Sequence, residues 1–247
     1  MNLLILEPGE SGDGSDTRDI LLSGARAEHL LNVLHVEPGA QVRVGILDGP
    51  RGVGTVKSID AQARTVMLRC TFDPALPPRP AVDLLLALPR PKVLRRLWAQ
   101  LAAMGVGQII LTNAERVERN YFDTHILAPE YYQPLLIEGL QQARDTWLPG
   151  VSVHRQFKVL IEDDLDGLFR SGRRLVADPS GTEPPRGSNS ERVLLAVGPE
   201  GGWNDFELHL LEAHGFRRVG MGARTLRTDT ACIALLAVVH DARNAVE

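Results

Sequence analysis

The residues best suited to chemistry lie in two glycine-rich segments. The first, Gly198-Pro199-Glu200-Gly201-Gly202, follows the apolar run 193–197 and precedes a helix-forming stretch. Glycines permit backbone conformations that are closed to other residues, and they let a ligand approach the main chain. Parallel sheets bind ligands at the carboxyl ends of their strands. This segment therefore predicts either a ligand-binding loop or a plain tight turn between a strand and a helix.

A second segment of the same kind, residues 220–231, also follows a predicted strand and precedes a predicted helix. Two such loops on neighbouring elements of one sheet favour a shared ligand site over two unrelated turns. Arg227 stands between this loop and the start of the final helix, where Thr228 or Asp229 can act as the N-cap. Arg227 is therefore a candidate for acting on the ligand.

Neither loop matches the common nucleotide-binding signatures. The first lacks the lysine and hydroxyl residue of a Walker loop, and it is not a GxGxxG dinucleotide turn. Cys70 and Cys232 are the two cysteines of the chain, and its seven histidines show no metal-ligand spacing. We therefore expect neither a disulfide framework nor a bound metal, and the cysteine count suits a reducing cytosol.

The residues after Val82 alternate between apolar strands and helices, which predicts an α/β domain with a parallel sheet. Continuous apolar runs indicate strands at 83–89, 106–114, 173–179 and 193–197, followed by a short strand at 217–222. Helices are expected at 93–105 with a glycine stop, after Pro134 within 129–147, at 205–216, and from Asp229 to His240. The polar stretch 181–191 is expected to form an exposed loop.

Residues 1–72 predict a small β-barrel with one helix. β-Branched residues alternate in 41–46, 52–59 and 65–70, turn signals separate these runs, and 26–36 has helical spacing. Four prolines in 73–81 indicate an extended linker. We therefore expect a barrel domain at 1–72, a linker at 73–81 and an α/β domain at 82–247.

Composition indicates an ordinary globular protein. Of the 247 residues, 44% are hydrophobic and 23% are charged. The first residues lack the features of a signal peptide, and no apolar run is long enough to span a bilayer, so we expect a cytoplasmic protein without a membrane partner. The net charge of −4 argues against binding nucleic acid through bulk electrostatics, although basic residues cluster between 79 and 100.

The paired loops carry a family resemblance. VGPEGGWNDFE followed by MGARTLRTDTA is similar to the signature of the ribosomal RNA small-subunit methyltransferase E family, within the SPOUT superfamily, with Met221 for Leu and Asp229 for Glu. Weaker similarity covers essentially the whole chain, at AEHLLNVLH, Lys92, Glu115-Arg116, Gln142 and Pro149.

The resemblance implies a SPOUT-type α/β trefoil knot with a parallel sheet, one of the rare knotted folds, behind an N-terminal PUA-like β-barrel that binds RNA. It also implies a homodimer and S-adenosylmethionine as the methyl donor. The implied reaction is methylation of N3 of one uridine in 16S ribosomal RNA, on the assembled small ribosomal subunit.

Carried onto this sequence, the resemblance implies Glu200 and Arg227 as the residues that orient or activate the target base. A carboxylate could accept the N3 proton, or the guanidinium could stabilise negative charge on the base. The basic candidates for RNA contacts are Arg26, Lys92, Arg95 and Arg116. The implied cofactor-binding residues are Gly198, Pro199, Glu200, Gly201, Gly202, Met221, Gly222, Arg224, Thr225 and Leu226.

The sequence departs from the family pattern in several places: the usual N-terminal arginine before an aromatic residue is missing, His35 and Asp145 replace an expected arginine, and Ala103 replaces an acidic residue. These departures leave the cofactor loops intact, and they affect the expected RNA contacts more than the methyl transfer. Two alternatives follow: a catalytically silent RNA-binding or ribosome-assembly protein of the same fold, and a methyltransferase of another RNA such as transfer RNA.

Overall fold

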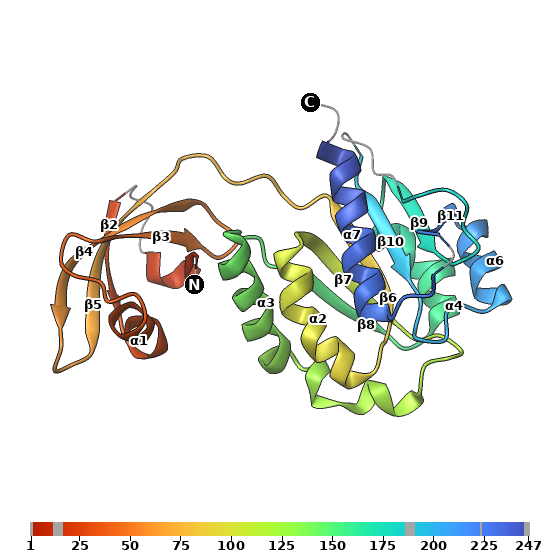
Figure 1. Cartoon of the computed structure of the whole chain (residues 1–247), viewed down its shortest axis with the longest axis horizontal. Coiled ribbons are helices and arrows are strands. Elements are labelled where there is room, and N and C mark those ends of the chain that lie inside the picture. Colours follow the sequence, from red (N-terminus) through yellow and green to blue (C-terminus); the bar gives the residue numbers. More distant parts are fainter. Residues whose placement is uncertain (1, 12–16, 186–190, 223, 245–247) are drawn as a thin grey trace. The chain divides into compact units, whose positions relative to one another are not determined.

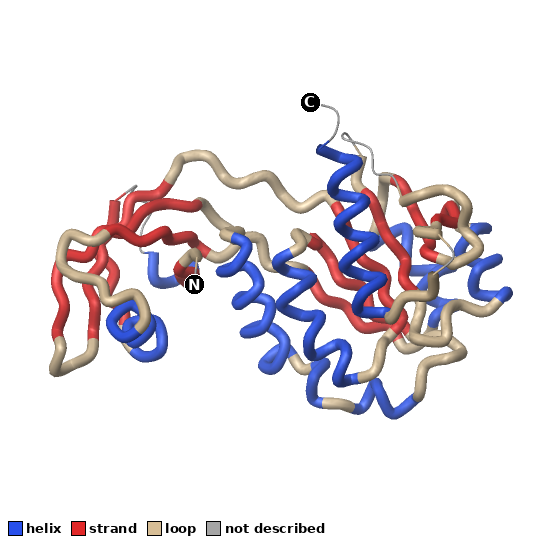
Figure 2. Tube along the Cα trace, viewed as in Figure 1, coloured by secondary structure: helices blue, strands red, loops and turns tan. Residues whose placement is uncertain are grey.

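A computed structural model describes residues 2–11, 17–185, 191–222 and 224–244. The chain divides into two compact units: residues 1–79 with 140–148, and residues 80–139 with 149–247. Figure 1 shows the course of the chain, and Figure 2 shows its secondary structure. None of the helices within the described ranges is long and apolar enough to cross a bilayer.

The first unit is a curled five-stranded sheet with one helix. Its strands are β1 (Leu4–Leu6), β2 (Thr17–Leu22), β3 (Gln41–Ile46), β4 (Arg51–Asp60) and β5 (Thr65–Phe72), in the order β1-β3-β4-β5-β2. The short 3-10 helix η1 (Pro8–Ser11) follows β1, and α1 (Gly24–Asn32) packs on β5. One face of each strand and of α1 forms an apolar core, which includes Leu22, Leu30, Val44 and Leu68. Burying this face against the helix stabilises the small unit.

Residues 140–148 join this unit, although no feature of the sequence indicated it. The Thr146 hydroxyl donates to the Gly49 carbonyl over 2.7 Å, and the Trp147 indole N–H donates to the Pro77 carbonyl over 2.8 Å. Asp145 accepts a hydrogen bond from Arg51 at 3.3 Å, and its own main-chain neighbour Thr146 donates to it as well. Asp145, which replaces an expected arginine, therefore serves an ion pair inside this unit.

The second unit is built on a fully parallel six-stranded sheet. Its strands are β6 (Val82–Ala87), β7 (Val106–Thr112), β8 (Gly150–His154), β9 (Arg173–Ala177), β10 (Val193–Val197) and β11 (Phe216–Val219), in the order β11-β9-β10-β6-β7-β8. Every residue of β6 and β10 is buried. Strands covered on both faces read as continuous apolar runs, which is why these two were readily predicted.

Helices cover the sheet on both faces (Figures 1 and 2). The helix α2 (Pro91–Ala103) packs on β7, and α7 (Thr228–Asn244) packs on β6, β10 and α2. The helix α6 (Asp205–Ala213) packs on β11. The remaining helical segments are η2 (Arg119–Asp123), η3 (His125–Leu127), α3 (Pro129–Ala143), α4 (Phe157–Val159), η4 (Leu160–Asp164) and α5 (Leu165–Leu168).

The predicted elements form near their expected positions, with one correction and several omissions. α3 begins at Pro129 rather than after Pro134, which lies inside the helix. Pro134 is the sixth residue of α3, so its missing N–H costs one intrahelical hydrogen bond, and the helix nevertheless continues through it. β1, β2, β8 and the helical turns at 157–168 were not predicted. The loop expected at 181–191 is described only to residue 185 and at residue 191, and its middle lies outside the described residues.

A buried carboxylate interrupts the pairing of β6 with β7. Asp83 is fully buried, its side chain pairs with Arg192, and the β6–β7 register shifts beside it. A Cβ at Gly107 would lie 3.0 Å from one Asp83 carboxylate oxygen, so glycine on the opposing strand lets the carboxylate pack closely against it. Burial raises the pKa of Asp83, against the opposing effects of Arg192 and of the Gln108 N–H.

The free energy of unfolding should depend on pH through the Asp83 carboxylate. A raised pKa in the folded state gives stability that is present at low pH and is lost as pH rises through the folded pKa. Asp83→Asn cannot titrate. The unfolding free energy of the wild type, relative to that of Asp83→Asn, should therefore increase as pH falls from 7 toward about 4. Urea unfolding at several pH values measures it, and a pH-independent difference would contradict this role.

Candidate active site

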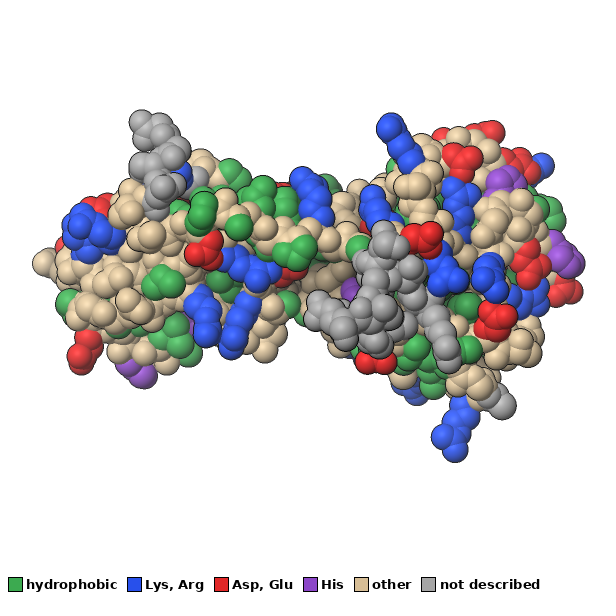
Figure 3. All heavy atoms as spheres, turned by 90° about the horizontal axis from the view of Figure 1, so that it is seen from above, with side chains coloured by type: hydrophobic (Ala, Val, Ile, Leu, Met, Phe, Trp, Pro, Cys, Tyr) green, Lys and Arg blue, Asp and Glu red, His purple; other side chains and the backbone are tan. Residues whose placement is uncertain are grey.

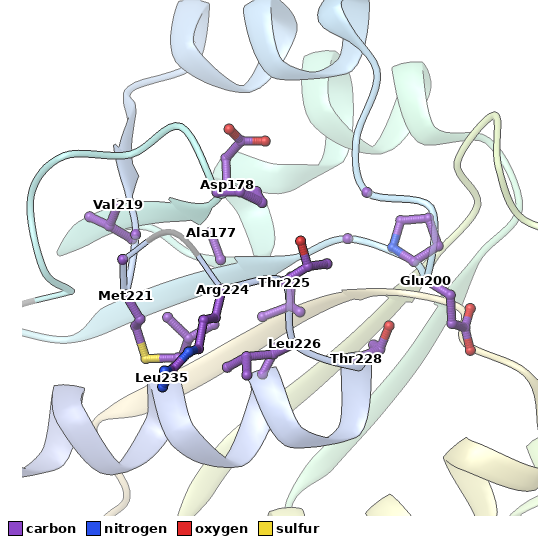
Figure 4. Close-up of a pocket in the computed structure, with 18 residues that line it drawn as sticks. Ala177, Asp178, Glu200, Val219, Met221, Arg224, Thr225, Leu226, Thr228 and Leu235 are labelled. Atoms are coloured by element: carbon purple, nitrogen blue, oxygen red, sulfur yellow. The ribbon is translucent and has the colours of Figure 1, made fainter.

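The carboxyl ends of three neighbouring strands, β11, β9 and β10, open onto one cavity that α7 closes from below in Figure 4. Each strand contributes the loop that follows it, and α7 contributes its first two turns. Ligand sites of open parallel sheets lie at this edge. The lining residues are Ala177, Asp178, Pro179, Val197, Gly198, Pro199, Glu200, Gly202, Val219, Gly220, Met221, Gly222, Arg224, Thr225, Leu226, Thr228, Ala231 and Leu235.

Main chain packs directly on main chain where the β9 and β11 loops meet. A Cβ at Gly181 would lie 2.3 Å from the Val219 carbonyl carbon, and a Cβ at Gly220 would lie 2.3 Å from the Gly181 oxygen. The Gly220 N–H donates to the Glu183 carbonyl over 2.8 Å, and the Asp178 N–H donates to the Val219 carbonyl over 2.9 Å. These contacts fix where the chain leaves β11 and enters the cavity wall.

The turn after β10 is tight and is tied to α6. Gly202 has a φ of 72°, a left-handed conformation that favours glycine, and its N–H donates to the Pro199 carbonyl over 2.8 Å. Asn204 then caps α6 in a capping box: Asn204 accepts from the Glu207 N–H, and Glu207 accepts from the Asn204 N–H. Trp203 is buried against Phe157 at a ring distance of 5.5 Å, which supports a packing role for this residue.

The loop after β7 is fastened to the same turn. Glu207 is almost fully buried, and its second oxygen accepts the Glu115 N–H over 2.7 Å. The Arg116 guanidinium donates to the carbonyl oxygens of Gly201 and Trp203. The glycine turn is therefore held on one side by a buried carboxylate and on the other by an arginine.

α2 and its N-cap residue contact both glycine-rich segments, 198–202 and 220–231. The Arg90 N–H, at the N-cap of α2, donates to Glu200 Oε1 over 3.1 Å. Further along the helix, Arg96 Nη2 pairs with Asp229 Oδ2 at 2.6 Å, and Asp229 lies in the first turn of α7. A carboxylate in a first helical turn is favoured by the helix dipole. α2 therefore sets the positions of Glu200 and of the start of α7 together.

Most of the residues expected to bind a cofactor line this one cavity. Of the ten, only Gly201 is missing from the lining, and Ala223 beside them lies outside the described residues. In Figure 4, Glu200 lies at one end of the labelled group and Met221 at the other. Arg227 is exposed and is not part of the lining; its carbonyl accepts the Ala231 N–H over 2.7 Å.

The residues expected to bind RNA fall in different surroundings. Lys92 and Arg95 are exposed on α2. Arg116 is engaged with main-chain oxygens, as described above, and Arg26 in the first unit forms an ion pair with Glu10. That ion pair raises the pKa of Arg26 and lowers the pKa of Glu10. Arg26 and Arg116 are thus bound to partners within the protein, whereas Lys92 and Arg95 are exposed.

Sequence reasoning missed the part of the cavity that β9 supplies. Ala177, Asp178 and Pro179 line it, and Asp178 also accepts a hydrogen bond from the Ser180 N–H over 2.9 Å. The sequence did predict the strand 173–179, whose carboxyl end supplies these residues. It did not show that this strand lies beside 193–197, because that requires the strand order.

Comparisons with known proteins agree with this geometry. The family profile described as RNA methyltransferase domain matches residues 77–240. Ribosomal RNA small subunit methyltransferase E of Treponema pallidum is 32% identical over 245 residues, covering 97% of this chain and 90% of that protein. Ribosomal RNA small subunit methyltransferase E 1 of Borreliella burgdorferi is 26% identical, covering 95% of each chain.

A solved structure shares the fold. The ribosomal RNA small subunit methyltransferase E of Neisseria gonorrhoeae, solved bound to S-adenosyl methionine, superimposes with a TM-score of 0.74 at 20% identity, covering 96% of this chain and 95% of that chain. This likeness confirms the predicted fold class, a SPOUT-type knotted α/β domain with a parallel sheet behind an N-terminal barrel.

Glu207 should be a main structural support of the site. Glu207→Ala would leave the part-buried N–H groups of Asn204 and Glu115 without their carboxylate acceptor, which should lower the free energy of unfolding by about 1–3 kcal/mol. Asp205→Ala, an exposed residue in the same helical turn, should cost under about 1 kcal/mol. Urea unfolding of both variants measures the difference, and equal losses would show that Glu207 has no special role.

Proposed function

The chain belongs to the ribosomal RNA small subunit methyltransferase E family, and from this premise we propose that it methylates N3 of a uridine in 16S ribosomal RNA with S-adenosylmethionine as donor. The observation that carries the proposal is the single cavity formed by the β9, β10 and β11 loops. Both glycine-rich segments that predicted a ligand line it.

The residues of the cavity suit this donor. Val197, Val219, Leu226 and Leu235 provide apolar surface for a flat purine, and the glycines leave main-chain groups open to polar contacts. Glu200 supplies a carboxylate at one end, where a positively charged group is favoured. We propose that the predicted cofactor-binding residues hold the donor in this way.

The chemistry needs little beyond positioning. S-adenosylmethionine, when bound, supplies a methyl group that its sulfonium already activates. The protein has to hold the uridine ring nitrogen in line with that group, and good alignment alone accounts for a large part of a rate enhancement. The target base has to leave its stack in structured RNA before it reaches the cavity.

Glu200 and Arg227 are proposed to act on the base. The uridine N3 carries a proton at neutral pH, and this proton has to leave for nitrogen to attack. The Glu200 carboxylate can accept it, and the exposed Arg227 guanidinium can stabilise the negative charge that develops on the ring. Neither group needs a metal to do so.

The proposed partner is the small ribosomal subunit, bound by a homodimer of this chain. On the face shown in Figure 3, acidic and basic side chains are interspersed within each unit, in keeping with the net charge of −4. Such a surface favours recognition through a few placed contacts over bulk attraction. The barrel and the exposed α2 residues Lys92 and Arg95 are the proposed contributors.

Methylation of isolated 30S subunits tests the proposed function. Subunits that lack the modification should gain one 3-methyluridine in 16S RNA when incubated with the protein and labelled S-adenosylmethionine, and nuclease digestion with mass spectrometry locates it. Incorporation into transfer RNA alone would assign the protein another RNA. Donor binding without any incorporation would favour the silent RNA-binding alternative.

Arg227→Ala should lower the single-turnover methylation rate by about 10²–10³-fold, because the charge on the base loses its stabilising partner. The donor affinity should change little, since Arg227 does not line the cavity. Calorimetry and rapid-quench assays measure the two quantities separately. A variant with the wild-type rate would remove Arg227 from the reaction.

A further inference from the structure

The edge of the sheet that carries the cavity continues past Glu200 onto β6 and β7. Arg90 follows β6 and is exposed, and its N–H holds the Glu200 carboxylate. Tyr121 and Glu118 belong to the segment that follows β7. β6 is the neighbour of β10, and β7 is the neighbour of β6. Side chains at these strand ends therefore lie next to the Glu200 end of the cavity.

Arg90 has a defined position there. Its guanidinium faces the Tyr121 hydroxyl, and that hydroxyl donates to Glu118 Oε1 over 3.0 Å. Burial raises the pKa of the Tyr121 hydroxyl and the bond to Glu118 adds to this effect, whereas Arg90 opposes it. Tyr121 therefore lies between a cation and a carboxylate, and the main chain of that cation is held at Glu200 by the Arg90 N–H.

Three of the neighbouring arginines are committed elsewhere. Arg116 donates to carbonyl oxygens of the glycine turn, Arg96 pairs with Asp229, and Arg155 pairs with Asp123. Within the described ranges, Arg90 forms no ion pair with an acidic side chain. A cation that is positioned yet not neutralised by direct pairing is the kind of group that stabilises charge developing on a substrate.

We infer that the target uridine docks beside Glu200 at the ends of β6 and β7, where Arg90 contacts the base and stabilises its anionic form. This inference rests on the proposed function. The N3–H proton leaves to Glu200 or to solvent, and the nitrogen electron pair forms the bond to the methyl carbon as the sulfur–methyl bond breaks. The products are 3-methyluridine, S-adenosylhomocysteine and one proton.

Tyr121 acts in this scheme as a positioning residue for Arg90. Its effect should then depend on the presence of Arg90, whereas a purely structural effect would not. Four titratable or charged groups surround the proposed docking position of the uridine. Glu200 belongs to the turn after β10, and Arg90, Glu118 and Tyr121 belong to the segments that follow β6 and β7.

The test compares full-length Arg90→Gln, Arg90→Lys and wild type in single-turnover methylation of 30S subunits between pH 6 and 9. Arg90→Gln should react about 10²-fold slower at pH 7, and its rate should keep rising at pH values where the wild-type rate has levelled off. Arg90→Lys should recover part of the rate because it restores the charge. Donor affinity, measured by calorimetry on each protein, should stay within about twofold of wild type, since Arg90 does not line the cavity.

Arg170→Gln is the matched control, because Arg170 is an exposed arginine that follows α5, outside the site. It should keep the wild-type rate and pH profile. Tyr121→Phe should slow the wild type several-fold but leave Arg90→Gln unchanged. Two outcomes would overturn the inference and leave the proposed function standing: an Arg90→Gln protein that keeps the wild-type rate, or one whose slower reaction is explained by weaker donor binding. A wild type that methylates no small-subunit RNA would overturn the proposed function and this inference with it.

Discussion

The cavity at the ends of β9, β10 and β11 depends on one contact, in which two backbone segments of the chain meet without room for a side chain. Gly181 lies against Val219 and Gly220, so the loop after β9 and the segment leaving β11 touch backbone to backbone. From there the chain passes the ends of β9 and β10 and reaches α7, which packs on β10 and β6. This contact also forms part of the cavity wall. Fold and ligand site are therefore set by the same atoms.

Charged side chains hold the loops around the cavity. Glu207 accepts main-chain N–H groups from two separate segments, and Arg116 satisfies two carbonyl oxygens of the glycine turn. Arg96 fixes Asp229 at the start of α7. Preorganised groups of this kind cost no rearrangement when charge develops in a reaction.

Sequence predicted the parts of this site whose signals are local. The apolar run 193–197 and the two glycine-rich loops each depend on neighbouring residues, and each formed as expected. The contribution of β9, the contact at Gly181 and the placement of 140–148 depend on strand order or on distant partners, which no local pattern encodes. At Pro134 a local signal misled the prediction: proline was expected to mark the start of a helix, but α3 begins at Pro129 and continues through it.

Direct titration of the protein with S-adenosylmethionine, side by side with Gly220→Ala, tests the central claim that the main-chain contact builds the donor site. A methyl group at position 220 would collide with the Gly181 oxygen, so it should displace the cavity wall. The account predicts saturable binding to the wild type and at least about a tenfold weaker affinity for the variant, with both sheets still folded by circular dichroism. Equal affinities, or no binding to the wild type, would contradict it.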